Sequence, residues 1–397
     1  MEKLQNRHIR LLQRVDNSFS RYLLEEIPWE EQLIGIKGAR GVGKTTMILQ
    51  HIKQKHGFNE NALYISLDDL YFAEHRLIDF VENFVNRGGE YLYIDEVHKY
   101  KNWSIEIKNI YDTYQELKVV FTGSSLLEIL NSRGDLSRRA LVYKLNGMSF
   151  REFLVLEHGI EIPKYTLEEI LTSHKKIATE ITSEYKPLKY FQQYLKVGYF
   201  PFYNGNEEIY YKRLIEIINM IVDIELPYLR NTDVSISNKI KQMLYVISQS
   251  VPFTPNVSSL ANKINTTRKT LLEYMNYLDD AQVFNKIYKE THGIGALQKP
   301  DKLYLENTNY MYAINADVPN IGNVRETFFL NQLKSKHVVN YGIKTDFRVD
   351  DNYIFEVGGK SKTQKQIADL ENAYIVKDDI LIGDKNVIPL WMFGLLY

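Results

Sequence analysis

The chain has 397 residues, of which 44% are hydrophobic and 25% are charged, and its formal net charge is −1 at pH 7. This composition is that of an ordinary soluble globular protein, and the length predicts roughly two to four domains. A net charge so close to zero excludes a global attraction for nucleic acid or membranes, so any basic patch must be local. The absence of cysteine excludes disulfide bonds and thiolate metal sites.

The first residues of the chain are charged throughout and lack the apolar centre of a secretory signal. No run approaches the ~18 apolar residues that are needed to span a bilayer. We therefore expect a cytoplasmic protein without a membrane partner.

A glycine-rich segment follows the first predicted strand, Leu33–Lys37. Its sequence, GARGVGKT, fits the pattern GxxxxGK[ST], and an amphipathic pattern over Thr46–Gln54 predicts the helix that should follow. Glycines let the backbone curl so that successive N–H groups point at a phosphate, at the positive end of a helix dipole. We expect Lys44, which we also count as catalytic, to reach the β- and γ-phosphates, and the Thr45 hydroxyl to coordinate Mg²⁺. The predicted nucleotide-binding residues are Gly38, Ala39, Arg40, Gly41, Val42, Gly43, Lys44, Thr45 and Thr46.

Two adjacent carboxylates end a second predicted strand. Tyr91–Ile94 is a β-favouring run that is followed by Asp95 and Glu96. We expect Asp95 to hold Mg²⁺ and Glu96 to polarise the attacking water as general base. Such a pair is common on protein surfaces, but its position after an apolar strand and downstream of a P-loop favours the catalytic interpretation. The chain has no Asn-Lys-x-Asp motif for reading guanine, so ATP is the expected nucleotide.

Two further segments supply candidate residues for ATP hydrolysis. A third predicted strand, Lys118–Thr122, leads into a Gly-Ser-Ser sequence in which Ser124 is a candidate for binding the γ-phosphate or the lytic water. Serines at this position would equally serve as N-caps of the next helix. Arg138 or Arg139 could act as an arginine finger on the γ-phosphate of a neighbouring subunit, which requires a homo-oligomer. The alternative is a solvated basic pair.

The chain resembles the AAA_14-type ATP-binding proteins of bacteria and archaea in the order of its motifs, which are GARGVGKTT, YLYIDEV with a downstream tryptophan, VVFTGSS, the paired arginines and SFREF. These proteins carry a C-terminal DUF4143 region and belong to the AAA+/STAND-like group of P-loop ATPases. Members usually have proline where this chain has Ala39, whereas Arg40 matches. Segments 194–203, 325–333 and 355–367 are similar to later landmarks of the family. The resemblance thus covers nearly the whole chain, and it implies an arginine that acts in trans.

Beyond the ATPase motifs the sequence changes character, because residues 151–230 read as amphipathic helices and the last hundred or so residues as short strands. We expect a mixed α/β protein of four parts. These are a P-loop AAA+-like ATPase domain with a parallel sheet (1–155), a helical connector (156–236), a winged helix-turn-helix (237–292) and a nuclease-like α/β domain (293–397).

The winged-helix prediction is based on two helices and the apolar run that follows them. One helix starts at Ser258, the second spans Arg268–Asp279, and the run AQVFNKIYK would form the first wing strand. Thr267, Arg268 and Lys269 would head a DNA-recognition helix. Acidic residues on the same helix offset its lysines, and such modules also serve for packing alone.

The C-terminal part is predicted to form strands within 302–314, 344–349, 353–359, 372–379 and 387–397, with helices at 322–335 and 363–371. Glu326, Asp346, Glu356 and a nearby lysine resemble the core of the PD-(D/E)xK nuclease fold. In active members the acids bind Mg²⁺, and a lysine two residues after the glutamate helps to activate water. Here position 358 is glycine and the first lysine is Lys360. This departure favours a nuclease-like scaffold without cleavage activity.

The sequence therefore predicts an ATP-binding protein that hydrolyses ATP with Mg²⁺ and works as a molecular switch or regulator on a protein partner or on DNA. The alternative is an ATP-gated, Mg²⁺-dependent DNA nuclease that uses Asp346, Glu356 and Lys360. An adaptor with a decayed ATPase is disfavoured, because Lys44 and the Asp95-Glu96 pair are intact.

Overall fold

The structure is a computed structural model that divides into two compact units, Met1–Gly147 and Met148–Tyr397. The described residues are 1–123, 136, 138–227, 235–249, 252–289, 299–315, 318–342, 344–363, 367 and 369–397.

The first unit is built on a parallel five-stranded sheet with the strand order β2-β3-β4-β1-β5. β4 lies between β1 and β3, so the strand that precedes the glycine-rich segment and the strand that ends in Asp95 both have β4 as a neighbour. This sheet confirms the predicted P-loop NTPase class. The strands are β1 (Leu33–Lys37), β2 (Ala62–Ser66), β3 (Tyr91–Asp95), β4 (Lys118–Gly123) and β5 (Leu141–Lys144).

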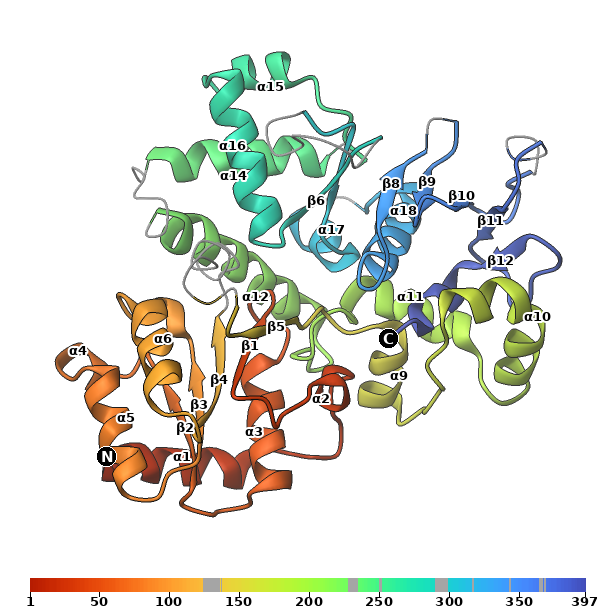
Figure 1. The fold of residues 1–397 in the computed structure, drawn as a ribbon. Helices are drawn as coiled ribbons and strands as arrows, with labels where there is room; N and C mark the ends of the chain where they lie inside the picture. Colours follow the sequence, from red (N-terminus) through yellow and green to blue (C-terminus); the bar gives the residue numbers. More distant parts are fainter. Residues whose placement is uncertain are drawn as a thin grey trace. The chain divides into compact units, whose positions relative to one another are not determined.

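Helices cover both faces of this sheet (Figure 1). α5 and α6 contact each other on one side, and α1 and α3 contact each other on the other side. α5 shows why such helices form, since its apolar residues at positions 77, 80, 81 and 84 recur at helical spacing and are buried. The helices are α1 (Glu2–Arg14), α2 (Leu23–Glu26), α3 (Lys44–Lys55), α4 (Tyr71–Glu74), α5 (Leu77–Asn86), a 3₁₀ turn (Val97–Lys99) and α6 (Trp103–Thr113).

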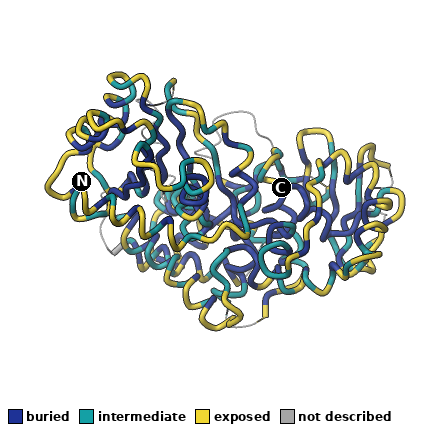
Figure 2. Tube along the Cα trace, turned by 90° about the horizontal axis from the view of Figure 1, so that it is seen from below, coloured by how far each residue is buried: buried dark blue, intermediate teal, exposed yellow. Residues whose placement is uncertain are grey.

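The second unit begins with helices, as the sequence predicts for residues 151–230. α9 and α10 each start with a capping box, in which Ser149 pairs with Glu152 and Thr166 with Glu169. In Figure 2 buried residues run through the interior of the fold and exposed residues lie on outer turns and helix faces. The helices are α9 (Phe150–His158), α10 (Leu167–Glu184), α11 (Pro187–Val197) and α12 (Glu207–Met220), which continues as a π-helical turn (Ile221–Glu225).

The landmark segment 194–203 lies in the core of this unit. Tyr194 and Phe200 are buried, and the Tyr194 hydroxyl donates a hydrogen bond to the carbonyl of Met148 at 2.7 Å. A Cβ atom on Gly198 would lie 2.3 Å from the Tyr194 ring and 2.9 Å from the Phe153 ring, so only glycine fits there. The segment is therefore explained by packing.

In the described part of residues 235–305, three helices and two strands form a small module. α15 and α16 contact each other, and β6 pairs with β7 in an antiparallel two-stranded sheet. Thr267 caps α16 by accepting a hydrogen bond from the Thr270 N–H. The elements are α14 (Ser235–Ser248), α15 (Val257–Lys263), α16 (Arg268–Asp280), β6 (Phe284–Ile287) and β7 (Lys302–Leu305).

A second five-stranded sheet, of order β12-β11-β10-β9-β8, completes the unit. It is mixed, because β8, β9 and β10 pair antiparallel whereas β10, β11 and β12 pair parallel. The elements are α17 (Thr308–Ile314), α18 (Ile321–Leu333), β8 (Val339–Tyr341), β9 (Phe347–Val349), β10 (Tyr353–Gly358), β11 (Ala373–Lys377), β12 (Val387–Pro389) and a 3₁₀ helix (Leu390–Leu395).

Two of the predicted strand segments are only partly strand. Within 302–314 the strand ends at Leu305, because Asn307 accepts a hydrogen bond from the Tyr310 N–H and starts α17. Within 387–397 the strand ends at Pro389, and the chain turns into a 3₁₀ helix. Residues 364–366 and 368 of the predicted helix at 363–371 lie outside the described residues.

The contact of α1 with the edge strand β2 predicts an acid-sensitive fold. His8 is 5% exposed, and its Nδ1 accepts the backbone N–H of Tyr64 at 3.1 Å, which requires a neutral ring. Burial lowers the pKa of His8 to about 4. The unfolded chain, with an ordinary histidine pKa near 6.5, takes up this proton first, so stability is lost as pH falls from about 6.5 toward 4.

We expect the wild-type chain to lose about 2 kcal/mol more unfolding free energy between pH 7 and pH 5 than the His8→Asn variant, which keeps an acceptor but does not titrate. Urea unfolding at the two pH values measures this difference. An identical pH dependence in both proteins would show that His8 is not the titrating group.

Candidate ATP-binding site

The glycine-rich segment forms a tight loop between β1 and α3. Gly41 and Gly43 have φ angles of 85° and 97°, in the left-handed region that favours glycine. Gly38 is needed for a second reason, because a Cβ atom there would lie 2.4 Å from the carbonyl oxygen of Leu145. The loop therefore has the curled backbone that the sequence predicts.

Lys44 is the first residue of α3 and is only 6% exposed. Its ammonium group donates hydrogen bonds to the carbonyls of Gly38 at 2.8 Å and Ala39 at 3.0 Å, so it lies across the loop. Thr46 is exposed in the first helical turn, where N–H groups have no helical acceptor. A cation and backbone N–H donors thus gather at one helix N-terminus, which is the arrangement that binds phosphate.

Asp95 is the centre of a hydrogen-bond network at the carboxyl end of β3. It is 2% exposed, and its Oδ2 accepts hydrogen bonds from the Thr45 hydroxyl at 2.6 Å and the Tyr64 hydroxyl at 2.8 Å. Its Oδ1 accepts from the Thr122 hydroxyl and from the Glu96 N–H at 3.1 Å. A hydroxyl and a carboxylate in contact are hard oxygen ligands, so Thr45 and Asp95 fit the Mg²⁺ that the family implies.

Glu96 has a φ of 55°, in the left-handed region that is uncommon for residues other than glycine. Its Oε2 lies 3.3 Å from Nε2 of His98, which is buried. Burial, followed by the charges of Lys99, Lys44 and Arg40, lowers the pKa of His98 to about 3, so the ring is neutral at physiological pH. The strained backbone turns the Glu96 side chain back toward His98, beside Asp95.

Sequence reasoning missed several residues of this network. Tyr64 belongs to no recognisable sequence motif. Burial and the Asp95 charge raise the pKa of its hydroxyl, so the hydroxyl keeps its proton and donates a hydrogen bond. Thr122 ends the third predicted strand, and its hydroxyl donates a hydrogen bond to Asp95. Arg21 is 4% exposed and donates to the carbonyls of Val42, within the loop, and of Asn146 at 2.8 Å. No sequence pattern marks Arg21, because its partners are backbone carbonyls distant in sequence.

The two candidate arginines, Arg138 and Arg139, have different surroundings. Arg139 forms two hydrogen bonds with Asp112 of its own chain, at 2.8 and 3.0 Å, and they hold the pKa of that carboxyl below its usual range. Arg138 is exposed. Ser124 lies outside the described residues.

The structure brings Asp346 and Glu356, two residues of the predicted second site, together. The backbone N–H of Asp346 donates to Oε2 of Glu356 at 3.1 Å, and Oδ2 of Asp346 accepts from the N–H of Val357 at 2.9 Å. Lys360 is exposed, and its carbonyl accepts from Lys377. The lysine at these carboxylates is instead Lys362, whose ammonium lies 2.5 Å from Glu356.

The side chain of Lys362 packs over Gly358, the position at which the nuclease motif has its lysine, since a Cβ on that glycine would lie 2.8 Å from Lys362 Cδ.

A second lysine, Lys302, lies 3.6 Å from Glu326 and 3.9 Å from Asp346. Burial and the Asp346 charge raise the pKa of Glu326, and the Tyr304 hydroxyl donates to it at 2.7 Å. The carboxylates are thus shared between two ammonium groups. In the part of the chain that the structure describes, no group of three or more histidine or acidic side chains is arranged to hold a metal ion.

Residues 30–154 match the model of the AAA_14 family, which is described as an AAA domain. This part of the chain is an AAA domain. It contains every residue predicted to act in ATP hydrolysis, from Gly38 to Arg139. The match does not extend to the region that resembles DUF4143.

The chain has a sequence relative in an uncharacterized protein of Methanocaldococcus jannaschii. The two are 28% identical over 273 residues, which are 65% of this chain and 57% of that protein. The chain therefore matches less than two thirds of the relative's length.

Two solved structures are similar to this chain at lower sequence identity than that relative. A Walker-type ATPase of Pyrococcus abyssi is 12% identical, with a TM-score of 0.43, over 78% of this chain and 94% of that chain. AMPPCP-bound DnaA from Aquifex aeolicus is 15% identical, with a TM-score of 0.28, over 65% of this chain and 84% of that chain. At these TM-scores neither similarity adds to the fold assignment.

Among the described residues, no helix is long and apolar enough to cross a membrane.

Proposed function

We propose that the chain binds ATP with Mg²⁺ at the AAA domain, hydrolyses it, and works as a molecular switch or regulator. The observation that carries this proposal is the 2.6 Å hydrogen bond between the Thr45 hydroxyl and the Asp95 carboxylate. It joins the end of the P-loop to the end of β3, which is where a P-loop ATPase holds its metal.

The side chains divide the reaction between them. The Lys44 ammonium exchanges its hydrogen bonds to two backbone carbonyls for hydrogen bonds to the β- and γ-phosphate oxygens. The first N–H groups of α3 also donate hydrogen bonds to the phosphates. Mg²⁺, when bound at Thr45 and Asp95, neutralises charge on the phosphates. Glu96 accepts the proton of the attacking water.

The second unit supplies the output of the switch in this proposal. The order of α14, α15, α16, β6 and β7 is that of a winged helix-turn-helix, and the bridge of Phe253 with Leu303 adds a third short strand contact to the pair β6–β7. The mixed sheet, with Asp346 directly before β9 and Glu356 on the adjacent strand β10, supports a nuclease-like fold. The four-part division of the chain and the cytoplasmic location remain predictions.

A nuclease gated by ATP is the second candidate function. The contact of Lys362 with Glu356 favours it, because the ammonium reaches the carboxylate from a position other than Lys360. The Lys302 ammonium opposes it, since it occupies the space between Glu326 and Asp346 where a cation would bind. We therefore favour a scaffold without cleavage activity.

Replacement of Glu96 by Gln tests the ATPase proposal. The variant loses the proton acceptor but keeps every contact to the phosphates and the metal. We expect its turnover to fall about 100-fold or more, with ATP affinity changed less than about threefold. Phosphate release and equilibrium binding of a fluorescent ATP measure the two quantities.

The same samples, incubated with supercoiled plasmid and Mg²⁺ or Mn²⁺, separate the two candidate functions. The proposal predicts phosphate release without nicking. Nicking that disappears in an Asp346→Ala/Glu356→Ala variant would instead establish the nuclease. Unchanged hydrolysis in Glu96→Gln would remove Glu96 as the base.

We further propose that Arg138 is supplied in trans to the γ-phosphate of a neighbouring subunit. Arg138 is exposed, whereas Arg139 is held by two hydrogen bonds to Asp112. An exposed guanidinium on the segment that leads into β5 is available to a second copy of the chain.

Turnover per chain should then rise with protein concentration, and Arg138→Ala should lower it strongly, since such arginines contribute roughly 10³–10⁵ in rate in GTPases. Mixing Arg138→Ala with Lys44→Ala chains should restore part of the activity, because each chain supplies what the other lacks. Steady-state phosphate release measures both effects.

Arg139→Ala is the matched control, because it removes the same charge one residue away and is expected to keep turnover within a fewfold of wild type. Turnover that does not depend on concentration and survives Arg138→Ala would end the proposal of a trans-acting arginine.

A further inference from the structure

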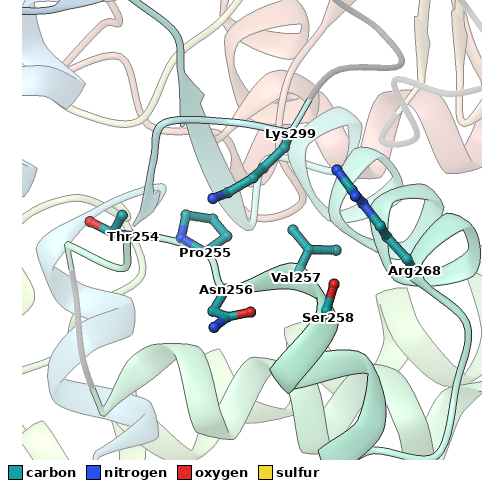
Figure 3. Close-up of a pocket in the computed structure, with 7 residues that line it drawn as sticks. All are labelled: Thr254, Pro255, Asn256, Val257, Ser258, Arg268 and Lys299. Carbon is teal, nitrogen blue, oxygen red and sulfur yellow. The ribbon is translucent and has the colours of Figure 1, made fainter.

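A pocket of about 390 Å³ lies on the module of α14, α15, α16, β6 and β7. It is lined by residues 254–258, which lead into α15, by Arg268 at the start of α16, and by Lys299, just before β7. In Figure 3 the Lys299 side chain extends over the pocket above Pro255 and Val257, and the Arg268 side chain rises beside it from α16. Three separate segments of the chain thus converge on one cavity.

The pocket is positively charged. Arg268 and Lys299 are both exposed, and no described carboxylate pairs with either of them. Among the residues that the structure describes, no acidic side chain lines the pocket. Two like charges beside one cavity, without a counter-ion among the described residues, indicate a site for an anion.

Neutral hydrogen-bond donors complete the site. Thr254 and Ser258 line the pocket and are exposed, so their hydroxyls are accessible to a ligand. Thr267 caps α16 with its side chain at 3.2 Å from the Thr270 N–H, so the 13-residue helix starts beside the pocket. Arginine, lysine, hydroxyls and a helix N-terminus are the groups that proteins use on phosphate oxygens.

The placement of the cations favours a phosphate chain over a single small anion. Arg268 and Lys299 come from different elements at an exposed surface, and Lys263 and Lys269 are exposed on the adjoining helices. α16 is a helix of the kind that enters the major groove, which is ~12 Å wide. Phosphate contacts at the start of such a helix fix its position on a duplex.

We propose that this pocket binds the phosphodiester backbone of duplex DNA through Arg268 and Lys299, and that the contact seats α16 against the major groove. The inference depends on the proposed function for the winged-helix module, and it assigns that module its partner and its phosphate-contacting residues.

The test is the salt dependence of binding to a fluorescein-labelled duplex of 30 base pairs, measured by anisotropy with the full chain. Each phosphate contact contributes about 0.9 to the slope of log affinity against log salt. The Arg268→Gln/Lys299→Gln variant should therefore have a slope smaller by about 1.8 and an affinity at least about tenfold lower near 0.1 M salt. Arg268→Lys/Lys299→Arg keeps both charges and should bind as wild type does.

A matched control removes two cations elsewhere. Lys175 and Lys176 line another pocket, on α10, but they pair with Asp384 at 2.8 Å and with Glu180 at 3.9 Å. Lys175→Gln/Lys176→Gln should leave DNA affinity and slope unchanged. Equal losses in both double variants, or no loss in either, would overturn the proposal.

Two more outcomes would also overturn it, namely no binding of the duplex by the wild-type chain and displacement of the duplex from the wild-type chain by inorganic phosphate at low millimolar concentration. ATP turnover of the Arg268→Gln/Lys299→Gln variant, measured in parallel, should equal that of wild type. A failure of ATP hydrolysis in the wild-type chain would reject the ATPase, whereas unaltered DNA binding in the variant would reject the pocket alone.

Discussion

One hydrogen bond, between the Thr45 hydroxyl and the Asp95 carboxylate, holds the parts of the ATP site in register. It exists because β1 and β3 are both neighbours of β4 in a parallel sheet, so their carboxyl ends meet at one edge. The Tyr64 hydroxyl from β2 and the Thr122 hydroxyl near the end of β4 also donate hydrogen bonds to this carboxylate. Side chains from α3, β2 and β4 are thus bound to one buried carboxylate at the end of β3.

The two charged sites of the second unit have opposite character. At the C-terminal sheet, the ammonium groups of Lys302 and Lys362 form ion pairs with the carboxylates of Glu326, Asp346 and Glu356. At the pocket of the small module, Arg268 and Lys299 form no ion pair with a described carboxylate. A site whose charges are paired within the chain has only a weak electric field to attract a charged ligand. A site whose charges are unpaired has a stronger field. We therefore expect a charged partner to bind at the module of α14, α15, α16, β6 and β7.

The P-loop strand, its helix and the β3 and β4 strands could be predicted closely, because glycine spacing and short apolar runs are local signals. Tyr64 and Arg21 could not, since each acts through a partner that only the tertiary fold brings near. Asn307 misled the strand prediction for 302–314, because an N-cap inside a β-favouring sequence overrides propensity. Lys362 replaced Lys360 at the carboxylates for a similar reason, as a turn decides which lysine folds back over Gly358.

The most direct test of the central claim is the effect of Mg²⁺ on ATP affinity in wild type and in Asp95→Asn. Asn keeps an acceptor for the Thr45 and Tyr64 hydroxyls but lacks the charge that holds the cation. Titration calorimetry with Mg²⁺ or with EDTA should show that Mg²⁺ strengthens ATP binding by about tenfold, or ~1.4 kcal/mol, in wild type, and that this gain is lost in the variant. An undiminished Mg²⁺ effect in a folded Asp95→Asn protein would contradict the account.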